Sequence, residues 1–178
     1  MRWKDEPVRL ALRPVTAFAP AIDVPVAAAP AILLAREARD AAWRHVSGHR
    51  VERGGLLIGE PFVHDGDADA IALVHVRAAV PAIDDTGDAI SLRMEARVWD
   101  AARAALRDHE RVVGWFHSHP DIGAFFSGTD RRTQAAFFAQ DFSLGWVMDP
   151  VRGEEAWFLG AEARDVVQSR VFTLEGPP

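Results

Sequence analysis

The sequence of 178 residues contains no cysteine. This absence excludes disulfide bonds, cysteine proteases and zinc sites that are held by thiolates. It also excludes the zinc-dependent nucleobase deaminases, because their metal site requires a Cys-x-x-Cys pair. Only metal sites built from other ligands remain.

An excess of positive charge is also lacking. The chain has 20 Lys and Arg residues against 26 Asp and Glu residues, so its formal net charge is -6 and its pI is near 5.6. This balance argues against nucleic acid as the main partner. It favours partners that present a basic surface.

Long uninterrupted apolar runs are absent from the Ala-rich N-terminal stretch. Prolines and an aspartate interrupt it, at Pro14, Pro20, Asp23, Pro25 and Pro30. No signal-peptide core and no membrane span of sufficient length remains. We therefore expect a cytoplasmic protein that has no membrane partner.

The composition indicates one α/β domain. A chain of this length with 49% hydrophobic residues can bury a single core. We expect residues 1–29 to form an extended lead-in, residues 30–174 the domain and residues 175–178 a tail. The sequence shows neither internal repeats nor low-complexity linkers.

Hydrophobic periodicity and turn signals predict an alternation of helices and strands. Helices are expected at about 31–47, 91–108 and 128–140. Strands are expected at about 8–12 and 21–26 in the lead-in, directly after Glu52, and then at 70–76, around Val112, and at 144–148, 155–159 and 170–174.

The most informative motif is His-x-His-Pro at the end of a short apolar run. Residues 111–116 have the composition of a buried strand, and His117 and His119 follow it directly. Residues two apart on an extended chain point to the same side, so both rings can face one ion. Pro120 ends ladder pairing, and Asp130 can return an oxygen ligand from the next helix. This set leaves a fourth tetrahedral position open, as in catalytic zinc sites.

The segment Ser127-Gly128-Thr129-Asp130 permits a second interpretation. A serine followed three residues later by an acidic residue is typical of a capping box that opens a helix. Ser127 can act both as a cap and in a site, whereas the two roles are harder to combine for Asp130. Histidines alone are a weak signal, because most are ordinary polar groups.

The full pattern, His117-x-His119-Pro120, six residues and then Ser127-x-x-Asp130, resembles the motif of the JAMM family, the MPN-plus or JAB-domain metalloproteases. Residues 51–59, Val-Glu-Arg-Gly-Gly-Leu-Leu-Ile-Gly, resemble that family's upstream element. The resemblance implies that His117, His119 and Asp130 bind one zinc ion, which would lower the pKa of a bound water from about 15.7 towards about 7. It implies that Glu52 is the general base and that Ser127 donates to the oxyanion.

The resemblance covers residues 30–174 and implies a mixed, mainly antiparallel sheet flanked by helices, similar to the cytidine-deaminase architecture. Family members that remove ubiquitin-like modifiers hold the modifier's C-terminal tail as an added strand. The corresponding segment is residues 77–95. We expect its Asp84, Asp85 and Asp88 to receive a basic tail that ends in Gly-Gly, although a solvated turn explains these carboxylates equally well.

We therefore expect a zinc metallo-isopeptidase or peptidase that cleaves after the C-terminus of a ubiquitin-like protein. It would release that protein from a target or mature its precursor. The implied partners are a bacterial or archaeal ubiquitin-like protein and its activating and conjugating enzymes. One alternative is a peptidase that processes a sulfur-carrier protein. Another is a non-catalytic scaffold of the MPN-minus kind, which normally lacks the metal ligands.

Overall fold

The computed structural model describes residues 11–18, 30–83 and 96–175. Its helices are α1 (Arg36–Val46), α2 (Ala96–Ala105) and α3 (Gly128–Phe137), with 3-10 turns η1 (Val15–Ala17) and η2 (Gln168–Arg170). Its strands are β1 (Arg13–Pro14), β2 (Ala31–Ala35), β3 (Gly54–His64), β4 (Asp67–Pro81), β5 (Arg111–Ser118), β6 (Leu144–Asp149), β7 (Glu154–Leu159), β8 (Arg164–Val166) and β9 (Val171–Leu174).

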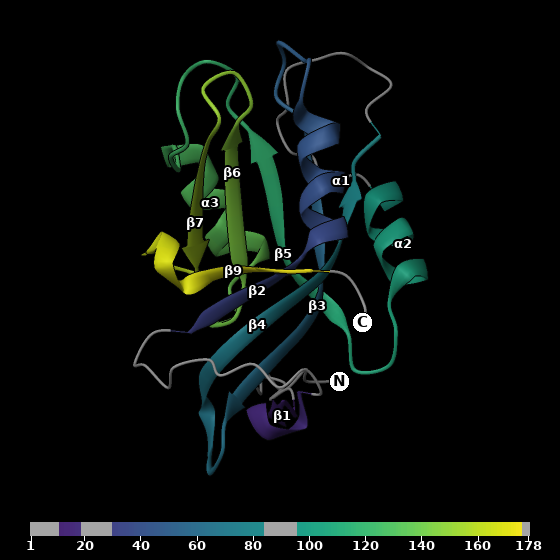
Figure 1. Cartoon of the computed structure of the whole chain (residues 1–178), viewed down its shortest axis with the longest axis vertical. Coiled ribbons are helices and arrows are strands. Elements are labelled where there is room, and N and C mark those ends of the chain that lie inside the picture. Colours follow the sequence, from purple (N-terminus) through teal and green to yellow (C-terminus); the bar gives the residue numbers. More distant parts are fainter. Residues whose placement is uncertain (1–10, 19–29, 84–95, 176–178) are drawn as a thin grey trace, which may run out of the picture.

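All nine described strands belong to one mixed sheet in the order β8-β7-β6-β5-β3-β4-β2-β9, with β1 paired to β3 (Figure 1). The long β3–β4 hairpin is antiparallel, and β3 also pairs antiparallel with β5. Strand β5 is parallel to β6 on its other side. The fold class predicted from the sequence, a mixed sheet with flanking helices, is confirmed.

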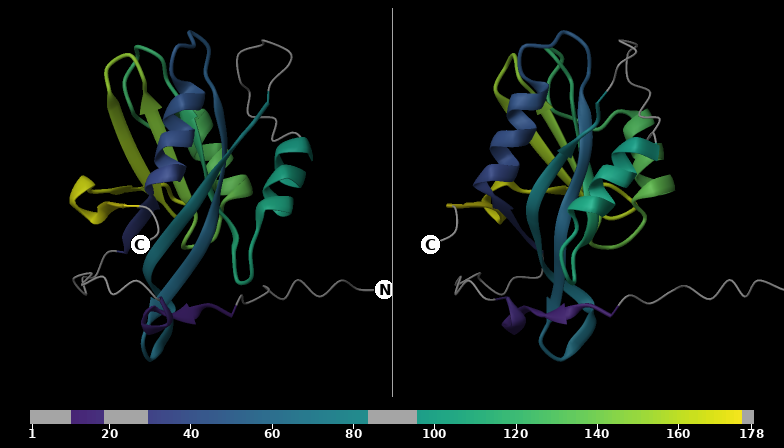
Figure 2. Two further views of the ribbon diagram at one scale, coloured as in Figure 1. Left: turned by 45° about the vertical axis from the view of Figure 1, so that its right-hand side comes forward. Right: turned by 90° about the vertical axis from the view of Figure 1, so that its right-hand side faces the viewer.

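The helices cover opposite faces of the sheet. Figure 2 shows α1 on one side and α2 with α3 on the other. Helix α1 packs its buried face, Ala38, Ala42 and Val46, into a core with Phe116 and Trp146. A second core joins both other helices to the sheet and includes Leu56, Ile58, Val98, Ala102, Trp115, Phe126, Phe138, Val147 and Phe158.

One sequence prediction is wrong at the start of the domain. We expected a helix at about 31–47, but residues Ala31–Ala35 form the parallel strand β2 and the helix begins at Arg36. Four consecutive residues of β2 are buried because β4 and β9 flank the strand and side chains cover both of its faces. A short apolar run of this kind cannot be assigned to helix or strand by periodicity alone.

Other boundaries differ by a few residues. Strand β4 extends over Asp67–Pro81 rather than 70–76, and α3 ends at Phe137 rather than near residue 140. Helix α2 ends at Ala105, and the predicted residues 91–95 at its start lie outside the described part. The short strand β8 was not predicted, whereas β9 confirms the strand expected at 170–174.

The described part of the N-terminal segment contacts the far end of the β3–β4 hairpin (Figures 1 and 2). Arg13 Nε and Nη2 each donate to a carboxylate oxygen of Glu60 at 2.6 Å, and the Phe18 ring packs edge-on to Phe62. The expected strands at 8–12 and 21–26 fall mostly outside the described residues. The division of the chain at residue 30 stays a prediction.

The carboxyl ends of β5 and β6 meet the amino end of β3 at one edge of the sheet. His117 lies opposite Gly54 of β3, and Ser118 lies opposite Met148 of β6. The residues that follow β5 and those that precede β3 therefore lie together at this end of the sheet. Among the residues that the structure describes, no helix is long and apolar enough to cross a membrane.

Candidate metal centre

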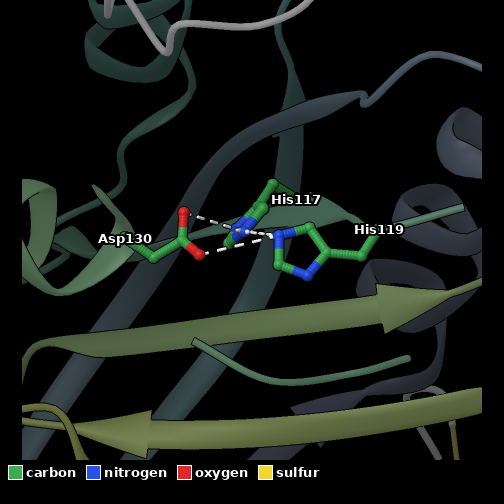
Figure 3. A group of neighbouring side chains, drawn as sticks. All are labelled: His117, His119 and Asp130. Atoms are coloured by element: carbon green, nitrogen blue, oxygen red, sulfur yellow. Dashed lines mark hydrogen bonds and ion pairs between the residues drawn. The ribbon is translucent and has the colours of Figure 1, made fainter. Parts of the chain in front are cut away.

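Two histidines converge at the end of β5. His117 is the penultimate residue of this strand and His119 follows its last residue. Both are almost fully buried, with 1% and 3% of their surface exposed, and their Nε2 atoms lie 3.1 Å apart (Figure 3). The backbone N–H of His119 donates to the carbonyl oxygen of Met148 at 2.9 Å, so β6 fixes the chain where it leaves the strand.

Asp130 completes the group from the first turn of α3. One carboxylate oxygen, Oδ1, lies 3.3 Å from Nε2 of His117, and Oδ2 lies 3.6 Å from Nε2 of His119 (Figure 3). Oδ2 also accepts the backbone N–H of Ser127 at 2.7 Å, while Oγ of Ser127 accepts the N–H of Asp130 at 3.3 Å. The capping box and the cluster therefore exist together, because Oδ1 faces His117 and takes no part in the capping box.

The three side chains fit a single zinc ion. The ligand atoms of His117, His119 and Asp130 all lie within 4.8 Å of one another. Two ligand atoms of a tetrahedral zinc with bonds of about 2.0–2.1 Å are about 3.3 Å apart. The distances of 3.1 Å between the two Nε2 atoms, 3.3 Å from His117 to Oδ1 and 3.6 Å from His119 to Oδ2 are close to that value. Imidazole nitrogens with a carboxylate oxygen are also the donors that zinc accepts in catalytic sites.

The electrostatics favour the forms of His119 and Asp130 that bind a cation. Burial lowers the pKa of His119 and His117 acts in the same direction, which favours the neutral ring. Burial alone would raise the pKa of Asp130, but hydrogen bonds from His117 and Ser127 outweigh it and lower that pKa to about 2. Neutral imidazoles and an ionised carboxylate are the forms that coordinate metals.

Glu52 approaches the same group from the segment before β3. Its Oε1 lies 3.7 Å from Nε2 of His119, and its side chain is 34% exposed. Burial raises the pKa of Glu52; His119 opposes this shift, and Asp130 adds to it. A partly exposed carboxylate beside the cluster can exchange protons both with water and with a substrate.

Two backbone-binding side chains in this region were not identified from the sequence. Ser118, between the two histidines, is fully buried and bonds to Arg53, next to Glu52. Asp149, the last residue of β6, is also fully buried and accepts the N–H groups of Asp121 at 3.0 Å and Gly123 at 2.7 Å. Their roles depend on contacts between distant segments. The only sequence signal was a polar residue within or directly after an apolar strand.

The acidic segment singled out for substrate binding cannot be placed. Asp84, Asp85 and Asp88 lie outside the described residues, so their role stays a prediction. The described neighbours of that segment include the end of β4, where the N–H of Ala82 donates to the carbonyl of Gly54 at 2.9 Å. This bond places Ala82 at the end of the sheet that carries the cluster.

A protein-family comparison identifies this arrangement. A family model described as prokaryotic homologs of the JAB domain matches residues 33–160, a span that contains Glu52 and the three candidate ligands. The chain belongs to this family. The JAB domain accounts for most of its described residues, and the family membership expected from the motif is confirmed.

Curated relatives of this JAB-domain chain include proteasome subunits. The 26S proteasome non-ATPase regulatory subunit 14 of Caenorhabditis elegans is 33% identical over 112 residues, which cover 60% of this chain and 33% of that protein. Ubiquitin carboxyl-terminal hydrolase RPN11 of Saccharomyces cerevisiae is 32% identical over 112 residues, which cover 60% of this chain and 34% of that protein. The chain thus spans about a third of the length of these relatives.

One solved structure shares the fold of this chain. A protein from Desulfitobacterium hafniense, determined in solution, superposes with a TM-score of 0.54 at 21% sequence identity. The superposition covers 82% of this chain and 94% of that one. At this identity, the likeness concerns the fold alone.

Proposed function

We propose that this JAB-domain chain is a zinc-dependent peptidase or isopeptidase that cleaves the amide bond after the C-terminus of a ubiquitin-like protein. His117, His119 and Asp130 would hold one zinc ion, which supplies a Lewis acid and a water of lowered pKa. The position of Glu52, with its carboxylate 3.7 Å from Nε2 of His119, is the observation that most favours a hydrolase over a structural metal site.

Glu52 and Ser127 would perform the proton transfer and stabilise the oxyanion. Glu52 would accept the proton of the attacking water and deliver it to the departing amine nitrogen, so that a neutral amine leaves. Its raised pKa suits a group that must both accept and release a proton near neutral pH. The hydroxyl of Ser127 accepts the N–H of Asp130 at a long 3.3 Å, and its own proton would be donated to the carbonyl oxygen of the substrate as negative charge develops.

The substrate class is supported by the relatives rather than by a visible contact. One relative is named a ubiquitin carboxyl-terminal hydrolase, and that match covers 60% of this chain. The net charge of -6 favours a modifier with a basic tail. We propose a ubiquitin-like protein of the same cytoplasm, together with its activating and conjugating enzymes, as the partners, and Asp84, Asp85 and Asp88 as contacts for the tail.

A cleavage assay with metal exchange tests this function. The substrates are fusions in which a fluorescent protein follows the terminal Gly-Gly of each ubiquitin-like protein encoded in the source genome, and ubiquitin joined to an aminocoumarin. We expect cleavage after Gly-Gly of at least one fusion, loss of cleavage on dialysis against a chelator, and recovery when one equivalent of zinc is returned. A zinc-loaded chain that cleaves none of these substrates would instead indicate a non-catalytic scaffold.

A further inference from the structure

The ring of His117 packs closely against aromatic side chains. Within the described part of the chain, its buried Nδ1 makes no hydrogen bond. Metal-binding histidines almost always donate this N–H to a carboxylate, a carbonyl or a water, which fixes the ring. Here the indole of Trp115 lies parallel to the imidazole, with 4.5 Å between ring centroids and 7° between planes. Phe126 lies beside both rings, with its centroid 6.0 Å from that of His117 and 5.5 Å from that of Trp115.

Trp115 is in turn fixed by Gln134 of α3. The indole Nε1–H donates to Oε1 of Gln134 at 2.6 Å. The amide Nε2 donates to the carbonyl oxygens of Ser143 at 3.1 Å and Gly160 at 3.0 Å. Gln134 is fully buried, so rotation of its amide would leave polar groups unpaired away from water, at a considerable free-energy cost.

Helix and strand periodicity join this hydrogen bond to the metal centre. Asp130 and Gln134 are four residues apart and share one face of α3. Trp115 and His117 are two residues apart and share one face of β5. The helix therefore contacts the strand at two adjacent points, Asp130 with His117 and Gln134 with Trp115. The second contact fixes how far α3 can slide or rotate relative to the histidine.

We propose that Gln134 and Trp115 are positioning residues for the zinc site. Their hydrogen bond sets the plane of the His117 ring and the placement of α3, so that Nε2 of His117 and Oδ1 of Asp130 face one ion without rearrangement. The inference rests on the proposed zinc site and goes beyond it, since neither residue supplies a ligand atom. Loss of either residue is expected to weaken zinc binding even when the chain still folds.

Zinc affinity in solution tests this inference. The variants are Trp115→Leu, which removes the stacked ring, Trp115→Phe, which keeps a ring and removes the N–H, and Gln134→Met. The matched control is Trp157→Leu, because Trp157 is equally buried but stacks on Trp146 in the core under α1, on the opposite face of the sheet. Affinity is measured by competition with a chromogenic chelator, and folding of each metal-free variant by its thermal transition.

We expect Trp115→Leu and Gln134→Met to weaken zinc binding about 10- to 100-fold, as is typical when the support of a metal ligand is lost. Trp115→Phe should lose less zinc affinity than Trp115→Leu. Trp157→Leu should lower the transition temperature while its zinc affinity stays near the wild-type value. Equal weakening in Trp115→Leu and Trp157→Leu would overturn the inference, as would unchanged affinity in Trp115→Leu and Gln134→Met. In both cases the wild-type chain still binds zinc, whereas a wild-type chain that binds none overturns the metal site itself.

Discussion

Ser118 and Arg53 are joined by two hydrogen bonds across the edge of the sheet. The backbone N–H of Ser118 donates to the carbonyl of Arg53 at 2.8 Å, and the backbone N–H of Arg53 donates to Oγ of Ser118 at 3.0 Å. Ser118 separates the two histidines and Arg53 follows Glu52. The pair therefore fixes the distance between the candidate base and the candidate ligands.

Replacement of Ser118 by alanine should separate these elements slightly without unfolding the chain. The variant leaves the N–H of Arg53 without its acceptor, so the free energy of unfolding should fall by about 1–2 kcal/mol. Because Glu52 loses one support, kcat should fall more than zinc affinity. Denaturant unfolding, zinc competition and steady-state kinetics measure the three quantities.

Ser169→Ala is the control for the Ser118 variant, because Ser169 is exposed and lies in η2. Its stability and kinetics should match those of the wild type. If Ser118→Ala retains full kcat, the double hydrogen bond does not position Glu52.

The ionised carboxylate of Asp149 should stabilise the turn after His119, and acid should remove this stabilisation. Burial would raise its pKa, but the backbone N–H groups of Gly123, Asp121, Arg152 and Val151 outweigh this and lower the pKa to about 2. A pKa that is lower in the folded than in the unfolded chain adds stability above the unfolded value of about 3.9. That stability is lost as the pH falls from about 4 towards about 2.

The variant Asp149→Asn removes this titration and one charged acceptor. At pH 7 its free energy of unfolding should be lower by about 1.5–3 kcal/mol, the usual contribution of hydrogen bonds to a charged group. The difference between wild type and variant should shrink below pH 4. Denaturant unfolding at a series of pH values measures it, and a difference independent of pH would contradict the assigned pKa.

Gly145 should tolerate no side chain. A Cβ at this position would lie 2.2 Å from Cζ of Phe126, whose ring stacks on Phe158 and lies 6.0 Å from the ring of His117. Gly145→Ala should therefore cost about 1–3 kcal/mol of stability through overpacking. It should also weaken zinc binding, because Phe126 is displaced against His117.

A second-site variant separates the causes of the Gly145 effect. Phe126→Leu in the Gly145→Ala background provides room and should recover part of the lost stability. Thermal unfolding of the single and double variants measures the recovery. Additive losses in the double variant would show that the clash with Phe126 is not the cause.

The sequence predicted the parts of the fold and site that depend on local pattern. Strand β5, the start of α3 at Ser127 and the meeting of His117, His119 and Asp130 follow from an apolar run, a capping signal and residue spacing. Their role as zinc ligands stays a prediction.

Features that depend on distant partners were not predicted. The apolar residues of β2 form a strand because β4 and β9 flank them, which no local period reveals. Gln134 looked like an ordinary helix residue, yet it is fully buried and bonded to Trp115, 19 positions away. Both cases show tertiary contacts overriding or supplementing the local signal.

The central claim is that the three ligands hold zinc while Glu52 performs proton transfer, and Glu52→Gln tests it most directly. The zinc content and kcat of this variant are measured on one preparation beside the wild type. We expect one zinc per chain in both proteins and a kcat that is lower by about 10²- to 10⁴-fold in the variant, the usual contribution of a general base. A wild-type chain without zinc, or a Glu52→Gln variant that cleaves at the wild-type rate, would contradict the claim.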